Sequence, residues 1–200
     1  MHPDQTPYDA LITLARSLGA SAAVVLPTEV LVVEERFAAM CGSPHRCPSY
    51  GLAPGCPPHA PSPAAFRAQL KTYRSMLVFK IDAPVAELIG PERLAIAHMI
   101  HEIAARVEHA VMDQGLGHAK GMAAGSCKEL FCGAEHDCRV LTSDQPCRFP
   151  DLARPSISAV GIDFSALAKL AGWPFARIEP ESSGDENPEM GLMAGLVLLA

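Results

Sequence analysis

One cysteine spacing occurs twice in this chain. The first set is Cys41, Cys47 and Cys56, and the second set is Cys132, Cys138 and Cys147, each 91 positions after its counterpart. Both sets read C-x5-C-x8-C, and the one remaining cysteine, Cys127, comes five positions before the second set. Soft metals and iron–sulfur clusters prefer thiolate ligands. The sequence therefore predicts metal chemistry in two loops, with all seven cysteines as ligands.

The first cysteine loop, residues 41–63, holds seven prolines and three glycines. Such a segment is unsuited to a helix or a strand, so its order has to come from another source. We expect a bound metal centre to supply that order. The second loop spans residues 127–150.

The two halves of the chain match beyond the cysteines. Each is predicted to run helix, Leu-Gly, extended segment, cysteine loop, helix and strand, and Leu18-Gly19 corresponds to Leu116-Gly117. We therefore predict one domain over 1–200 with an internal repeat of 1–90 and 91–200. The expected fold class is α/β or α+β, a mixed sheet with flanking helices and two pseudo-symmetric halves that each carry a cysteine loop.

Local patterns predict the individual elements. Helices are expected over 8–18, 34–40, 63–73, 92–114, 155–160 and 164–170, and strands over 22–26, 30–33, 76–81, 175–178 and 192–199. Ser62 and Asp163 are expected to be N-caps. The polar stretch 181–189 is expected to be a loop, and the apolar stretch 190–200 a core strand, an edge strand or a dimer edge.

Composition excludes several classes of function. The chain has 200 residues, a net charge of −6 and only 6% aromatic residues, which argues against nucleic-acid binding. The N-terminus has no signal-peptide pattern, and the longest apolar run, 190–200, is too short to span a bilayer. We expect a soluble, cytoplasmic protein, where cysteines stay reduced and bind metals more often than they form disulfides.

Three interpretations of the cysteines compete, and the first is iron–sulfur ligation. A cubane cluster takes four ligands, which the second loop offers once Cys127 is included. The first loop offers three, because the position equivalent to Cys127 is Arg36. Its fourth ligand would be His45, His59, a cysteine of the other half, or none, which leaves an open iron.

The second interpretation is structural zinc, which is often held by four thiolates. The usual C-x2-C pair is missing, and the nearest pair is Cys127-x4-Cys132. The wide gaps and the Cys56-Pro57 step favour a cluster over zinc. The third interpretation is disulfides or buried thiols without a ligand.

Several segments resemble a known family. They are G-S-C-K-E-L-F-C (125–132), C-R-F-P (147–150), A-R-P-S-I-S-A-V-G-I-D-F (153–164) and C-P-S-Y-G (47–51). The chain resembles, over nearly its whole length, the bacterial and archaeal "predicted metal-binding protein" family, domain of unknown function 2284. The resemblance implies metal binding by these cysteines, with an iron–sulfur cluster as the expected group, and no particular reaction.

Other polar residues are secondary candidates. Arg148 and Arg154 flank the last cysteine and are predicted to bind the cofactor, by hydrogen bonds to a cluster or by attracting an anionic ligand. The alternative for both is a salt bridge or a solvated side chain. On the long helix, four polar residues suggest either a metal site or, as we expect, a solvated polar face: His98, His101, Glu102 and His109.

The sequence thus favours a metal-binding, [4Fe-4S] iron–sulfur protein with one or two clusters, in electron transfer or an accessory redox role. One alternative is a small reductase-like enzyme that uses a three-cysteine cluster with an open iron, and another is a zinc-binding interaction module. No catalytic residue is assigned. Expected partners are a redox protein or a small molecule, with no nucleic acid and no membrane, and a homodimer is possible.

Overall fold

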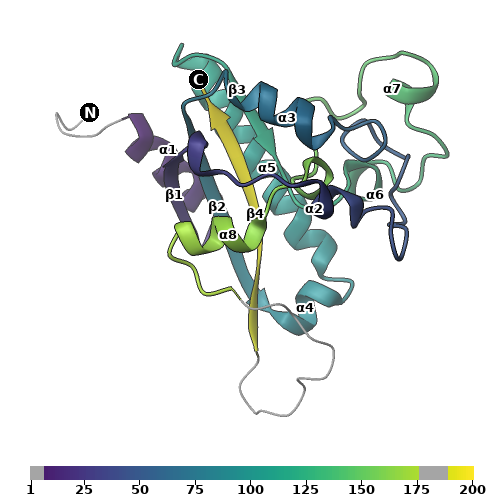
Figure 1. Cartoon of the computed structure of the whole chain (residues 1–200), viewed down its shortest axis with the longest axis horizontal. Helices are drawn as coiled ribbons and strands as arrows, with labels where there is room; N and C mark the ends of the chain where they lie inside the picture. The colour runs from purple at the N-terminus through teal and green to yellow at the C-terminus, as the bar shows by residue number, and fades with distance from the viewer. Residues whose placement is uncertain (1–6, 176–188) are drawn as a thin grey trace.

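The fold is built on one four-stranded sheet. The computed structural model describes residues 7–175 and 189–200. The strands are β1 (Ala22–Pro27), β2 (Ser75–Pro84), β3 (Ala119–Met122) and β4 (Met190–Leu199). Their order is β1-β2-β4-β3, and each neighbouring pair is antiparallel (Figure 1). Helices flank this sheet, which confirms the predicted α/β or α+β class.

The helices connect these strands. They are α1 (Pro7–Ser17), α2 (Glu35–Ala39), α3 (Pro63–Leu70), α4 (Val85–Ile89), α5 (Arg93–Asp113), α6 (Cys127–Phe131), α7 (Arg139–Thr142) and α8 (Phe164–Leu170), with short 3-10 turns η1 (Thr28–Val30) and η2 (Ser158–Val160). Both predicted N-caps are confirmed. The Ser62 side chain accepts a hydrogen bond from the Ala65 N–H at 3.2 Å, and Asp163 accepts one from Ala166 at 3.1 Å.

Alternate residues of the central strands pack on opposite faces of the sheet. Leu77 and Phe79 of β2 join a core cluster with α1 and α5. Met76 and Val78 of the same strand join a second cluster with α3 and α8. The sheet is therefore the middle of three layers, and the long helix α5 supplies most of one outer layer (Figure 1).

The C-terminal strand β4 lies inside the sheet. It pairs with β2 along ten positions and with β3 along four, and its last residues are buried on both faces. The prediction of a core strand is confirmed, whereas the edge-strand alternative is wrong. β2 pairs with one edge of β4 along its whole length, and β3 pairs with the other edge only along Leu196–Leu199. A homodimer stays a prediction. Within the described part of the chain, no helix is both long and apolar enough to cross a bilayer.

Two predicted elements differ from the structure, and two more lie mostly outside the described residues. Residues 30–33 form no strand, because Val33 makes a single bridge to Ile162. In the stretch 155–160 only 158–160 is helical, because Ser156 bridges to Ala123 instead. The predicted strand 175–178 and loop 181–189 fall mostly outside the described residues.

The element order is compatible with the predicted repeat. The strand order β1-β2-β4-β3 has one half of the chain on each side of the sheet centre. Gly19 and Gly117, which precede β1 and β3, both have a φ of +109°. These features agree with a duplication, but the equivalence of the two halves stays a prediction.

Truncation of Ile100 is expected to destabilise the fold. Ile100 is fully buried on α5 and faces the sheet beside Gly195. Replacing it with alanine should lower the free energy of unfolding by about 2–5 kcal/mol, from lost apolar burial and the resulting cavity. Urea denaturation measures the change. Ile89→Ala, at a side chain that is 67% exposed, is the control, and an equal loss in both variants would contradict this packing.

Candidate metal centre

The two cysteine loops meet on one side of the molecule, to the right of the sheet in Figure 1. The Cys56 thiol donates a hydrogen bond to the Ser126 Oγ at 3.4 Å, across 70 positions of sequence. The Ser156 N–H donates to the Gly55 carbonyl at 3.3 Å. The end of the first loop therefore packs against both the start of α6 and the segment that follows the second loop.

The first loop is ordered by its own main chain. The Cys47 N–H donates to the Cys41 carbonyl at 2.9 Å, and the Gly51 N–H donates to the Pro57 carbonyl at 2.7 Å. Ala53 is fully buried between these turns. Hydrogen-bonded turns and packing therefore contribute to the order of this loop, and the contribution expected of a metal centre stays a prediction.

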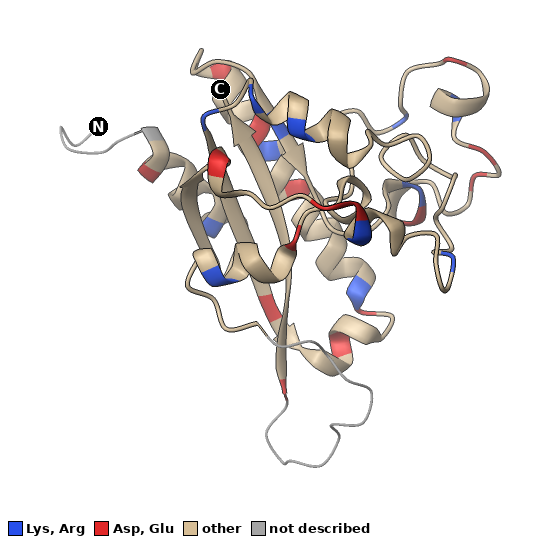
Figure 2. Ribbon diagram, viewed as in Figure 1, with Lys and Arg blue, Asp and Glu red and all other residues tan. Residues whose placement is uncertain are grey.

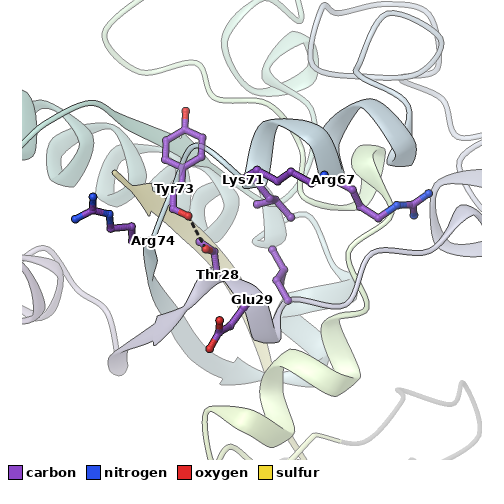
Figure 3. A pocket seen from close by; sticks show the side chains of 8 residues that line it. Thr28, Glu29, Arg67, Lys71, Tyr73 and Arg74 are labelled. Atoms are coloured by element: carbon purple, nitrogen blue, oxygen red, sulfur yellow. Dashed lines mark hydrogen bonds between the residues drawn. The ribbon is translucent and has the colours of Figure 1, made fainter.

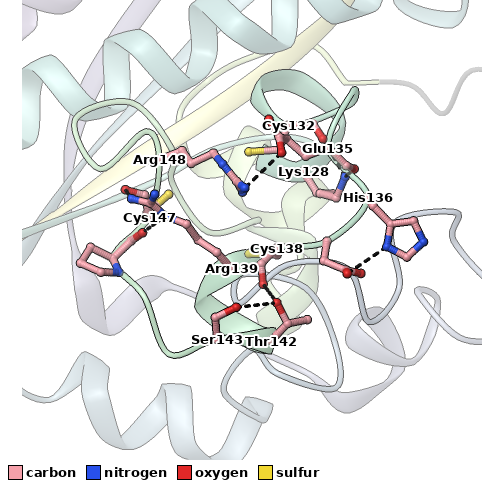
Figure 4. A network of polar contacts seen from close by, with 12 residues as sticks. Lys128, Cys132, Glu135, His136, Cys138, Arg139, Thr142, Ser143, Cys147 and Arg148 are labelled. Atoms are coloured by element: carbon pink, nitrogen blue, oxygen red, sulfur yellow. Dashed lines mark hydrogen bonds and ion pairs between the residues drawn. The ribbon is translucent and has the colours of Figure 1, made fainter.

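Basic side chains form hydrogen bonds to main-chain carbonyls of the second loop (Figure 4). The Lys128 ammonium donates to the carbonyls of Cys132 and Glu135, each at 2.6 Å. The Arg139 guanidinium donates to the carbonyl of Pro146 and, at 3.3 Å, to that of Cys147. Each cation thus holds a turn of the loop by its carbonyls and places positive charge close to the cysteines. Sequence reasoning missed these two residues, although both lie one position from a cysteine.

All seven cysteines are free thiols, and these thiols affect one another electrostatically. The pKa of Cys127 is raised to about 12, and burial is the largest cause. Four neighbouring thiolates raise this pKa further, in the order Cys56, Cys147, Cys138 and Cys132. In the first loop, burial raises the pKa of Cys41, and the thiolates of Cys47 and Cys56 add to it. A bound cation would relieve this repulsion between ionised thiols.

Arg148 lies among the thiols of the second loop. Burial and then the Cys147 thiolate raise the pKa of Cys132, and the positive charge of Arg148 opposes them. Its guanidinium forms an ion pair with Glu135 at 3.0 Å, and Figure 4 shows it between Cys132 and Cys147. A role in binding a cofactor stays a prediction for Arg148, and this position favours it.

The seven predicted ligands are thus brought into one region. Among the described residues, however, no three histidine, cysteine, aspartate or glutamate side chains form a group that could hold a metal ion. The donor set nevertheless fits a metal centre by its chemistry, because it concentrates thiols whose ionised forms repel one another. Metal binding would have to draw the thiols of each set together.

The histidines of the two cysteine loops lie at the surface. His45 and His59 are exposed, as is His136, which pairs with Asp137 at 2.9 Å. Arg36, at the position equivalent to Cys127, forms an ion pair with Glu34 at 2.5 Å. The fourth ligand of the first loop stays a prediction, with His45, His59, a cysteine of the other half or none as the alternatives.

The Arg154 side chain is buried, and it forms an ion pair and several hydrogen bonds with other parts of the protein. Its Nε pairs with Glu108 at 3.0 Å, and its Nη1 donates to the carbonyls of Pro150 and Ala153, each at 3.0 Å. Its main-chain N–H donates to the Nδ1 of His101 at 3.0 Å. This geometry matches the salt-bridge alternative. Arg154 anchors the chain after the second loop to α5, and it is poorly placed to contact a cofactor.

The expected solvated face of α5 is partly wrong. His98 is exposed, but His101 is fully buried and lies edge-on to the ring of Phe131 at 5.4 Å between centroids. Phe131 also contacts Phe149, at 5.6 Å. Aromatic side chains from the second loop thus cover this part of the helix. Burial lowers the pKa of His101 to about 4, so the imidazole is neutral at pH 7.

A hollow of about 570 Å³ lies away from these residues, beside α3 (Figure 3). It is lined by Thr28, Glu29, Leu31, Arg67, Leu70, Lys71, Tyr73 and Arg74. This lining has no cysteine or histidine, so the predicted metal chemistry has no thiolate or imidazole ligand there. Around the cysteine loops, Figure 2 shows ribbon segments of both charge signs.

Comparison with known proteins gives one match. The profile of a family described as "Predicted metal-binding protein (DUF2284)" matches residues 24–199, a range that includes both cysteine loops. No curated protein and no solved structure matches the chain.

Gly55→Ala tests the contact between the first loop and the segment after the second loop. An added Cβ would lie 2.6 Å from the Pro155 Cα, a main-chain atom that cannot move aside alone. We expect a loss of about 1–3 kcal/mol in the free energy of unfolding, measured by urea denaturation. Gly42→Ala is the control in the same loop, because its Cβ would meet no atom closer than 3.5 Å. Equal stability of both variants would contradict the contact.

His101 is expected to make stability depend on pH. In the unfolded chain its pKa is near the ordinary value of 6.5, whereas in the folded chain it is about 4. Between these values the unfolded state binds more protons, so stability falls as the pH is lowered through this window. The loss amounts to about 3 kcal/mol over the whole window.

The measurement is urea denaturation of wild type and His101→Asn between pH 7 and pH 4. The asparagine retains an acceptor for the Arg154 N–H and has no titrating group. Its stability should decline less steeply with falling pH, whereas His98→Asn, at an exposed site on the same helix, should follow wild type. Identical slopes for wild type and His101→Asn would refute the assignment.

Proposed function

Since this chain belongs to the family of predicted metal-binding proteins (DUF2284), we propose that it is an iron–sulfur protein whose cysteines hold one or two [4Fe-4S] clusters for electron transfer or accessory redox chemistry. The observation that carries the proposal is the meeting of the two cysteine loops. The thiolates of Cys56, Cys147, Cys138 and Cys132, which come from both loops, lie close enough to Cys127 to add to the burial that raises its pKa.

The chemistry of the thiols supports a cluster. Iron–sulfur clusters take thiolate ligands, and a cluster supplies one-electron transfer when bound. Ligation requires the thiols to lose their protons, which burial and mutual repulsion oppose in the absence of a metal. The C-x5-C-x8-C spacing and the absence of a C-x2-C pair favour iron–sulfur over structural zinc.

The surroundings of the thiols would tune such a cluster. Lys128, Arg139 and Arg148 place positive charge beside the second loop, and positive charge near a cluster favours its reduced form. Phe131 and Phe149 form an apolar layer between this loop and α5, and the shell around a cluster limits solvent access. Cys47 is exposed, so the first loop lies at the surface, where a redox partner can approach.

The proposed setting is a reducing compartment, with the cytoplasm as the expected one, because free thiols persist there. The proposed partner is a redox protein or a small redox-active molecule. A zinc-binding interaction module is the alternative that the experiment must exclude.

Anaerobic purification and metal analysis test the proposal. We expect brown protein with about four irons and four labile sulfides per cluster, and an electron paramagnetic resonance signal on reduction. Cys47→Ala should lose iron without a change in circular dichroism, because this side chain is exposed and packs against little. Ser43→Ala, exposed in the same loop, should retain its iron. Colourless protein that contains zinc and no sulfide would refute the iron–sulfur assignment.

A further inference from the structure

Resting on the function proposed above, we infer that Ser126 is a positioning residue for the metal centre. Its hydroxyl donates a hydrogen bond to the Cys56 sulfur when that sulfur binds a metal. This hydrogen bond strengthens metal binding and raises the reduction potential of a bound cluster. Ser126 is not itself a metal ligand, because it acts only through Cys56 of the first loop.

The contact between Ser126 and Cys56 carries this inference. The Cys56 Sγ lies 3.4 Å from the Ser126 Oγ, although the two residues are 70 positions apart in the sequence. Only 4% of Ser126 and 7% of Cys56 is exposed, so both side chains are largely shielded from water. A hydrogen bond in such surroundings is electrostatically stronger than one in water. A charge on this sulfur therefore depends on the protein for its hydrogen bonds.

The Ser126 hydroxyl has an unused donor. A hydroxyl can donate one hydrogen bond and accept two. Within the part of the chain that the structure describes, both hydrogen bonds of this hydroxyl are ones that it accepts, from the Cys56 thiol and, at 3.3 Å, from the Lys128 N–H. The O–H proton of Ser126 thus has no acceptor there, and an unsatisfied donor is costly in a buried place.

Metal binding supplies the missing acceptor. A cysteine that binds a metal has lost its proton, so Cys56 then has no hydrogen to donate to Ser126. Its sulfur carries negative charge instead and accepts the hydroxyl proton, and hydrogen bonds to a charged acceptor are roughly twice as strong as neutral ones. The oxygen still accepts from the Lys128 N–H, so the cap of α6 is retained. A donor that bonds a metal ligand orients the ligand and tunes the metal.

Both partners are held in place by contacts of the main chain. The Cys56 N–H donates to the Ala53 carbonyl at 3.0 Å, and the Leu130 N–H donates to the Ser126 carbonyl at 3.2 Å. Ser126 is also the N-cap of α6. The hydroxyl therefore lies beside the sulfur before any metal binds, and the change of donor requires only that the hydroxyl proton rotates.

Reduction potentials test the inference in the iron-loaded protein. Ser126→Ala and Ser126→Gly both remove the hydroxyl, and the potential of the cluster that Cys56 ligates should become more negative in each. Glycine is nearly as good an N-cap as serine, so a shift that both variants share does not come from a lost cap. Ser126→Thr retains a hydroxyl and should keep the wild-type potential.

Ser62→Ala is the matched control, because Ser62 is the N-cap of α3 and its hydroxyl accepts from the Ala65 N–H. It should lose stability in urea and keep the wild-type potential. Circular dichroism checks the fold of every variant. An unchanged potential in both Ser126→Ala and Ser126→Gly, or a shift of equal size in Ser62→Ala, would overturn the inference.

Cobalt separates this inference from the iron–sulfur proposal. The metal-free protein is titrated with Co²⁺ under anaerobic conditions, and the thiolate-to-cobalt charge-transfer band reports binding. Ser126→Ala and Ser126→Gly should bind Co²⁺ about 10–100-fold more weakly, with the band at lower energy, because a sulfur without the hydrogen bond releases charge more readily. If the protein holds no iron or sulfide, the proposed function fails and the cobalt comparison decides the inference. Wild-type affinity and band energy in both variants would overturn it.

Discussion

The ion pair between Arg154 and Glu108 fixes the segment on which both cysteine loops rest. Both side chains are largely buried, with 6% and 16% of their surface exposed. A buried charge is stable only when it is paired and hydrogen-bonded, and Arg154 meets this condition through Glu108 and two carbonyls. Glu108 also accepts a hydrogen bond from the Gly121 N–H, which links the pair to β3. The second loop thus ends at a point fixed to both α5 and the sheet.

The same segment positions the first loop. Immediately after Arg154, Pro155 packs on Gly55, and the Ser156 N–H donates to the Gly55 carbonyl. Cys56 follows Gly55 in the sequence. The contacts of Gly55 with Pro155 and Ser156, which involve no thiol, therefore bring the Cys56 thiol to the start of α6. The meeting of the two loops is therefore a result of the protein fold.

Local signals were predictable from the sequence, whereas non-local contacts were not. The caps Ser62 and Asp163 were found because a cap depends on residues within one helical turn. The burial of His101 was missed because the isoleucine stripe of α5 indicates one packed face, and a second covering comes from Phe131 of a distant loop. The seven cysteines could be grouped by spacing, but spacing cannot show that Cys56 lies beside α6 across 70 positions.

The predicted repeat relates the contact between Cys56 and the start of α6 to the first half of the chain. In the first half, the position that corresponds to Cys127 is Arg36, which pairs with Glu34 and has no thiol. If the halves are equivalent, this difference leaves three cysteines in the first set and four in the second. The two sets therefore differ in the number of thiols that each half supplies, although the fold brings Cys56 of the first set to the start of α6.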